Sequence, residues 1–201
     1  MPSWAWIVIV VAAVVVTAAV VWAAMKSRRS RVLQDRFGPE YDRTVRATDD
    51  KREAEAELAA RAERRDSLDI RPLTPAARER YLAQWQEVQA RFVDDPEGAV
   101  RDADMLIQSA MRDRGYPVDD FEQRSADISV DHPHVVENYR QGHRLASASA
   151  RGDGSTEDLR QAMQHYRALF EELVDSPSDA ALSREDDAVV ADDGQAVSRR
   201  G

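Results

Sequence analysis

Four histidines and many carboxylates are the residues with which this 201-residue chain could do chemistry, since it contains no cysteine. His132 and His134 flank Pro133, and Glu137 follows three residues later, a spacing that can place two ligands on one helix face. With His143, this group defines an alternative function, a small metal-dependent enzyme. A histidine at a helix start or beside an apolar stripe is more often structural, and no His-Glu-x-x-His motif occurs. The sequence therefore favours neither a metal site nor a cofactor.

Acidic pairs are frequent, but each has a structural explanation. General acid–base catalysis needs two carboxylates that converge in a cleft with separated pKa values. Asp94-Asp95 and Asp119-Asp120 stand where helix caps are expected, and Asp102 and Asp104 are typical of a solvated helix face. The chain also lacks a glycine-rich phosphate loop, a Gly-x-Ser-x-Gly motif and a recognisable Ser/His/Asp set. The sequence therefore predicts a protein without enzymatic activity.

Composition narrows the class of protein further. The net charge of −9 argues against nucleic acid as the main partner, because phosphate binding needs a cationic surface. Hydrophobic residues make up 43% of the chain and charged residues 32%, which excludes both wholesale disorder and a protein with many membrane spans.

An apolar run from Trp4 to Met25 predicts a transmembrane anchor over residues 1–25. Thr17 is the one polar residue in the run, whose roughly 33 Å of helix would cross a hydrocarbon core of about 30 Å. A cleaved signal peptide is the competing interpretation. It requires a positive segment before a shorter apolar core, and no Lys or Arg precedes this run.

Basic residues directly after the run predict its orientation. Lys26, Arg28, Arg29 and Arg31 follow the span, and the positive-inside rule places such a cluster in the cytoplasm. We expect the N-terminus outside the plasma membrane, the remaining chain in the cytoplasm and the lipid bilayer as one partner. The inverted arrangement, with the same domain displayed outside the cell, is the alternative.

Residues 26–71 are predicted to form a basic juxtamembrane segment and a charged helical spacer. Phe37-Gly38-Pro39 interrupts the helix, and from Glu40 to about Leu68 the composition returns to helix formers. A single helix over that range would be roughly 40 Å long. Its apolar stripe is too thin for a strong coiled coil, so a solvated spacer is expected, with a weak dimer through residues 40–68 as the alternative.

Residues 72–174 are predicted to form a compact bundle of about five helices. Thr74-Pro75 and Asp95-Pro96 each combine an N-cap residue with proline at the first helical position. Gly115 is expected to end the second helix and His132-Pro133 to start the fourth. Apolar residues recur every three or four positions, and no alternating run predicts a strand.

The predicted class is therefore all-α, with a disordered acidic tail over residues 175–201. The tail carries seven acidic and three basic residues and no aromatic one.

Five short segments of the connector and the helical part are distinctive when taken together. They are Arg36–Tyr41, Arg91–Pro96, Arg114–Val118, Ser129–Pro133 and Tyr166–Phe170. With them the chain resembles a family of uncharacterised, single-pass membrane-anchored proteins from high-GC Gram-positive bacteria. The similarity covers roughly residues 33–174. It implies a recurring unit but no activity, so no functional residue carries over.

A tether, a spacer and a helical domain without catalytic motifs favour a non-enzymatic interaction or scaffold protein. We expect it to recruit an unidentified protein to the membrane, in envelope or stress physiology. The physical hypothesis is a groove between helices that accepts an amphipathic partner helix or peptide. Trp85, Phe92 and Phe121 are the candidate contact residues, because a tryptophan near the rim of a small domain can anchor a partner.

Overall fold

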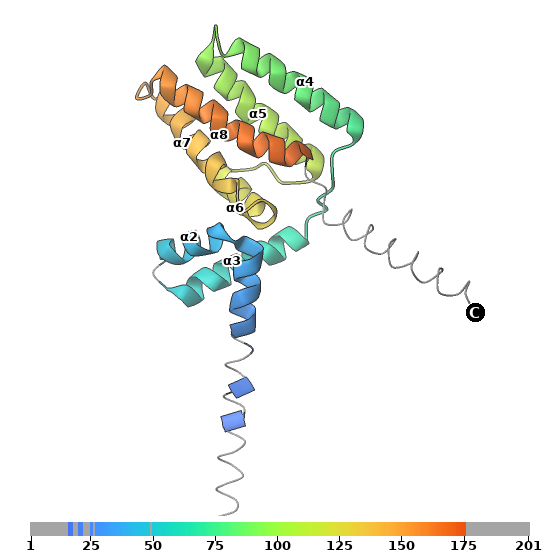
Figure 1. The fold of residues 1–201 in the computed structure, drawn as a ribbon, viewed down its shortest axis with the longest axis vertical. Coiled ribbons are helices and arrows are strands. Elements are labelled where there is room, and N and C mark those ends of the chain that lie inside the picture. Colours follow the sequence, from blue (N-terminus) through green and yellow to red (C-terminus); the bar gives the residue numbers. More distant parts are fainter. Residues whose placement is uncertain (1–15, 18–19, 22–24, 26, 49, 176–201) are drawn as a thin grey trace, which may run out of the picture. The chain divides into compact units, whose positions relative to one another are not determined.

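A computed structural model describes residues 16–17, 20–21, 25, 27–48 and 50–175, and in this part of the chain all regular secondary structure is helical (Figure 1). The predicted all-α class is therefore confirmed for these residues. The chain divides into two compact units, residues 1–60 and 61–201. The sequence placed the start of the globular part at residue 72, eleven residues after the start of the second unit.

Most of the predicted anchor lies outside the described residues, as does the predicted tail from residue 176 onward. No helix within the described ranges is long and apolar enough to cross a membrane. Of the predicted membrane-flanking residues, Lys26 is also outside these ranges, whereas Arg28, Arg29 and Arg31 are helical and exposed.

The first unit folds where a single straight spacer was predicted. Helical residues 27–37 are followed by α2 (Pro39–Thr48) and α3 (Lys51–Asp66), so the prediction of one helix from Glu40 to Leu68 is wrong. The start of α3 is capped locally, because Asp50 Oδ1 accepts the backbone N–H of Arg52 at 2.7 Å. This cap is the sequence signal that the prediction missed.

Hydrogen bonds to one carboxylate connect the helices of the first unit. Glu55 Oε1 accepts the hydroxyl of Tyr41 at 2.8 Å and that of Ser30 at 2.6 Å. Tyr41 and Leu58, two of the few apolar residues that a dimer through this segment could use, are buried within the chain. The spacer therefore has a small core of its own.

Five helices form the second unit, in agreement with the predicted number. They are α4 (Pro75–Arg91), α5 (Pro96–Arg114), α6 (Phe121–Asp131), α7 (Val136–Ala150) and α8 (Thr156–Asp175). Thr74, Asp95 and Asp120 each accept a backbone N–H from the first turn of the helix that follows, which confirms the predicted caps.

Two chain reversals test the predicted end of one helix and the predicted start of another. Gly115 ends α5 in the left-handed conformation, φ 101°, as predicted, and a Cβ there would lie 2.3 Å from the carbonyl oxygen of Asp69. The predicted start of the fourth helix at His132-Pro133 is wrong. His132 ends α6, where its N–H donates to the Ile128 carbonyl at 2.8 Å, and α7 begins at Val136.

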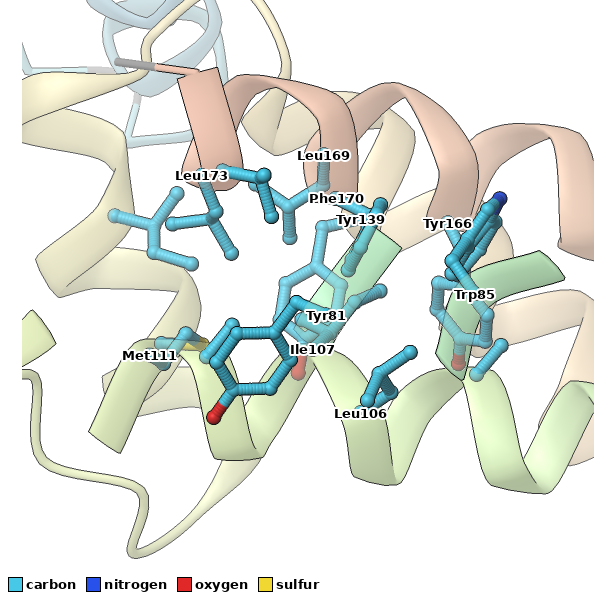
Figure 2. Close-up of a cluster of buried hydrophobic side chains, with 14 of the residues drawn as sticks. Tyr81, Trp85, Leu106, Ile107, Met111, Tyr139, Tyr166, Leu169, Phe170 and Leu173 are labelled. Atoms are coloured by element: carbon cyan, nitrogen blue, oxygen red, sulfur yellow. The ribbon is translucent and has the colours of Figure 1, made fainter. Parts of the chain in front are cut away.

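The core of the second unit is built around α8, which packs against α4, α5 and α7 (Figures 1 and 2). Trp85 from α4 stacks on Phe170 from α8, with ring centroids 4.5 Å apart and planes 13° from parallel. The buried side chains of α8 are Leu159, Ala162, Met163, Tyr166, Leu169, Phe170, Leu173 and Val174.

We predict that Phe170→Ala lowers the free energy of unfolding by about 3–5 kcal/mol, because it removes a fully buried ring and leaves a cavity against Trp85. Gln164→Ala, on the exposed face of the same helix, should change it by about 0.5 kcal/mol or less. Urea unfolding of the full chain, followed by circular dichroism, measures both. Equal effects of the two substitutions would contradict the central position of α8.

Candidate functional site

The three aromatic residues predicted to contact a partner do not form an exposed patch. Trp85 is only 5% exposed and belongs to the core, so its proposed role as a surface anchor is wrong. Phe92 ends α4 and packs partly buried against the same core. Phe121 is also partly buried, and its ring stacks on that of His143 with centroids 3.7 Å apart.

The predicted metal-ligand group is not assembled either. His132 Nδ1 lies 3.2 Å from Glu172 Oε1, whereas His143 stacks on Phe121. Glu137 accepts hydrogen bonds from Gln141 and Arg144, and His134 is exposed in the turn before α7. Across the described ranges, no three His, Asp or Glu side chains are grouped so that they could hold a metal ion.

A buried charge cluster lies where the ends of α3, α5, α6 and α8 meet within the second unit. Arg65 Nε donates to both carboxylate oxygens of Asp131, at 2.6 and 2.8 Å, and the hydroxyl of Tyr116 donates to the same carboxylate. Arg114, 2% exposed, donates from Nη1 to the Leu173 carbonyl at 2.8 Å. These groups have partners within the protein, which indicates a structural role for the cluster.

His132 borders this cluster and is 4% exposed. Burial and, to a smaller extent, the positive charge of Arg114 lower its pKa, and the hydrogen bond to Glu172 opposes the shift. His132 is therefore neutral at pH 7. Its Nε2 is buried without a hydrogen-bond partner, which makes protonation in the folded state still less favourable.

The candidate site is a cavity of about 490 Å³ between α5, α7 and α8. On α5 the lining positions are 97, 100, 101 and 104, one face of the helix, and on α7 they include 143, 146, 147 and 150. Leu159 and Tyr166 of α8 complete the lining. The three helices thus line a half-open hollow whose volume is within the size range of small-molecule sites, about 300–1,000 Å³.

Small residues at the end of α7 create this space. Residues 146–150 read Ala-Ser-Ala-Ser-Ala, so α7 presents no large side chain to α5 there. Gly142, one turn earlier, allows the Tyr166 ring to lie against the helix, because a Cβ at that position would meet the ring at 2.8 Å. A packed core would need larger side chains at these positions.

Asp104 of α5 lines the cavity, and its carboxylate is hydrogen-bonded to side chains that are not part of the lining. Asp104 Oδ2 accepts the amide of Gln108 at 2.6 Å, and the hydroxyl of Tyr139 points to Asp104 Oδ1 from 3.4 Å. Arg124 Nε in turn donates to the Tyr139 oxygen at 3.1 Å. Arg124 therefore holds Tyr139 in place and makes no direct ion pair with Asp104.

Two groups on the cavity wall have no hydrogen-bond partner among the described residues, the Tyr166 hydroxyl and the His143 imidazole. Tyr166 is 1% exposed, and burial together with the nearby Asp104 carboxylate raises its pKa, so its hydroxyl keeps its proton. Burial lowers the pKa of His143 more than Asp104 raises it, so the imidazole is neutral. Neither group is among the fully buried polar atoms that lack a partner, so both face the hollow, where water or a ligand can bond to them.

A second hollow, about 380 Å³, lies between α4 and α5. Three of its four charged lining residues are already paired, because Arg91 bonds to Asp102 and Arg80 donates to Asp113 at 3.0 Å, while Glu87 has no ion pair among the described residues. Tyr81 also donates to Asp113, at 2.7 Å. This groove is consequently less suited to a polar ligand than the cavity between α5, α7 and α8.

The sequence analysis considered Asp104 and His143 but did not connect them, and it did not single out Tyr166 as a site residue. No local motif joins the three residues, which come from three helices. The one available signal was the Ala-Ser run at 146–150, whose small side chains indicate a gap at the end of α7.

No protein-family model matches the chain, and no curated protein or solved structure shows significant similarity to it. The family resemblance described from the sequence stays a prediction.

We predict that the free energy of unfolding falls as the pH is lowered from about 7.5 to 5.5. Unfolded histidine takes up a proton near pH 6.5, whereas the lowered pKa of His132 keeps it neutral in the folded state. The contribution of one histidine is at most about 1.4 kcal/mol per pH unit.

Urea unfolding at several pH values measures this slope, and His132→Gln should make it shallower. His134→Gln, at an exposed position in the following turn, is the matched control and should leave the slope unchanged. His143 contributes in the same direction, so His132→Gln should leave part of the slope in place. An identical slope in His132→Gln and the parent chain would contradict the assignment.

Proposed function

We propose that this chain is a membrane-tethered, non-enzymatic binding protein whose second unit receives a polar ligand in the cavity between α5, α7 and α8. One observation carries the proposal: the wall of that cavity presents the Tyr166 hydroxyl and the His143 imidazole without partners in the described chain. Both groups are accessible from the cavity, so a ligand can replace the water that otherwise bonds to them.

The membrane part of the proposal rests on the sequence. The apolar run over residues 4–25 is long enough to span a bilayer, and the basic residues that follow it favour a cytoplasmic second unit. The non-enzymatic part rests on the absence of a catalytic motif from the sequence. In this proposal the anchor localises the protein and ligand binding in the cavity controls its interaction with a partner protein.

Cysteine labelling in intact cells tests the tether and its orientation, because the natural chain has no cysteine. Asp153→Cys places a thiol in the exposed loop between α7 and α8, and Ser3→Cys places one before the apolar run. We expect a membrane-impermeant maleimide to label the second variant in intact cells and the first only after lysis. The reverse pattern would show that the domain is displayed outside the cell.

Histidine NMR of the full chain in detergent micelles tests the cavity. Small amines, carboxylates, sugars and nucleosides are added in turn, and the imidazole signals are followed after assignment with His143→Gln. We expect at least one class to move the His143 signal and leave that of His165, whose Nδ1 lies 2.9 Å from the Asn138 side-chain oxygen outside the cavity lining. If no class moves the His143 signal, the proposed function is wrong.

A further inference from the structure

We propose that the ligand of this cavity is an organic cation, an ammonium or guanidinium group on a short aliphatic stem, with Asp104 as its counter-ion. The inference rests on the proposed function and specifies the chemistry of the same site. The group has two possible sources, a free amine and the Lys or Arg side chain of a partner protein, which the experiment below separates.

Asp104 makes no direct ion pair within the described residues, and the nearest basic group in its hydrogen-bond network is Arg124, which reaches it through the Tyr139 hydroxyl. Among the described residues no basic group lies within ion-pair distance of Asp104, and its neighbours are the neutral side chains of Gln108 and Tyr139. Several other aspartates of the second unit are paired with an arginine, whereas Asp94 and Asp119, like Asp104, have no such pair among the described residues. These pairs are Asp102 with Arg91, Asp113 with Arg80, Asp127 with Arg64 and Asp131 with Arg65.

The remaining lining favours a cation over an anion. The lining has two carboxylates, the half-buried one of Asp104 and the exposed one of Glu97, and one exposed guanidinium, that of Arg101. Neutral His143 and the Tyr166 hydroxyl each offer a lone pair to a donor. An ammonium group could therefore donate to Asp104 and to these acceptors, whereas an anionic ligand would be repelled by Asp104.

The apolar part of the lining sets the shape of the ligand. Val100 and Leu159 are buried side chains of the lining, and Ala146 and Ala150 add small apolar side chains from α7. Such apolar side chains can contact a chain of methylene groups. The combination of a carboxylate without a direct ion pair, neutral acceptors and apolar side chains matches a charged head on a short stem.

The experiment measures binding to the full chain in detergent micelles by isothermal titration calorimetry, with the His143 NMR signal as the reporter of location. The probes are butylammonium and butylguanidinium, and their matched controls are neutral butanol and anionic butyrate. We expect the two cations to bind and to move the His143 signal, and the two controls to do neither.

Substitutions then assign the counter-ion. Asp104→Asn should weaken binding of the cations about tenfold or more, because it removes a charge-assisted hydrogen bond and keeps the shape of the side chain. Asp102→Asn is the matched control, since Asp102 lies on the same helix, bonds to Arg91 and is absent from the cavity lining. Equal affinities of these two variants would overturn the proposal.

A second variant keeps the test informative if Asp104→Asn unfolds. Tyr166→Phe removes one hydroxyl that has no partner in the described chain and keeps the ring that packs in the core. It should weaken cation binding several-fold with no loss of helical circular dichroism. If this variant binds the cations with unchanged affinity, the assignment of Tyr166 to the binding site is overturned.

A blocked tripeptide, acetyl-Gly-Arg-Gly-amide, distinguishes a side chain of a partner protein from a free small molecule as the source of the cation. Its binding would support an arginine side chain from a partner protein, and binding of butylguanidinium alone would support a free small molecule. If butyrate moves the His143 signal and the cations do not, the cation proposal is overturned and the proposed function stands. If neither these probes nor the wider set of compounds moves the His143 signal, the cation proposal and the proposed function are both overturned.

Discussion

Burial of the apolar face of α8 is the constraint on which the second unit depends. The helix carries large apolar side chains through five turns, and α4, α5 and α7 are arranged so as to cover them. The stacked pair of Trp85 and Phe170 shows the consequence, since the tryptophan most suited to anchor a partner is needed inside. In a domain of this size the few large side chains available are required for stability before they can serve binding.

The cavity lies where the neighbouring helices cover α8 incompletely. Tyr166 takes part in the core through its ring, while its hydroxyl faces a gap that the Ala-Ser end of α7 leaves open. Larger side chains at residues 146–150 would fill the gap and stabilise the bundle. Helix α7 thus has two roles, covering α8 along most of its length and forming one wall of a polar space at its end.

Buried charge has different consequences in two parts of the same unit. Around Asp131, one carboxylate receives Arg65 and Tyr116, so the charge is compensated and the ends of several helices are held together. At Asp104 the carboxylate receives only neutral groups from the described chain. Two aspartates that look alike in the sequence therefore differ in what they can bind, because one already has its arginine.

The sequence by itself determined the helical class, the caps at Thr74, Asp95 and Asp120 and the glycine that ends α5, since each of these depends on a few neighbouring residues. It did not anticipate the break between α2 and α3, where the side chain of Asp50 and the contacts of Glu55 outweigh the continuous run of helix formers. Only the tertiary structure decided that Trp85 is buried, that His132 and His143 are separated, and that Asp104, His143 and Tyr166 share a cavity. The physical reason is that these outcomes depend on side chains from three or more helices, whose approach is set by packing around α8 and not by spacing along the chain.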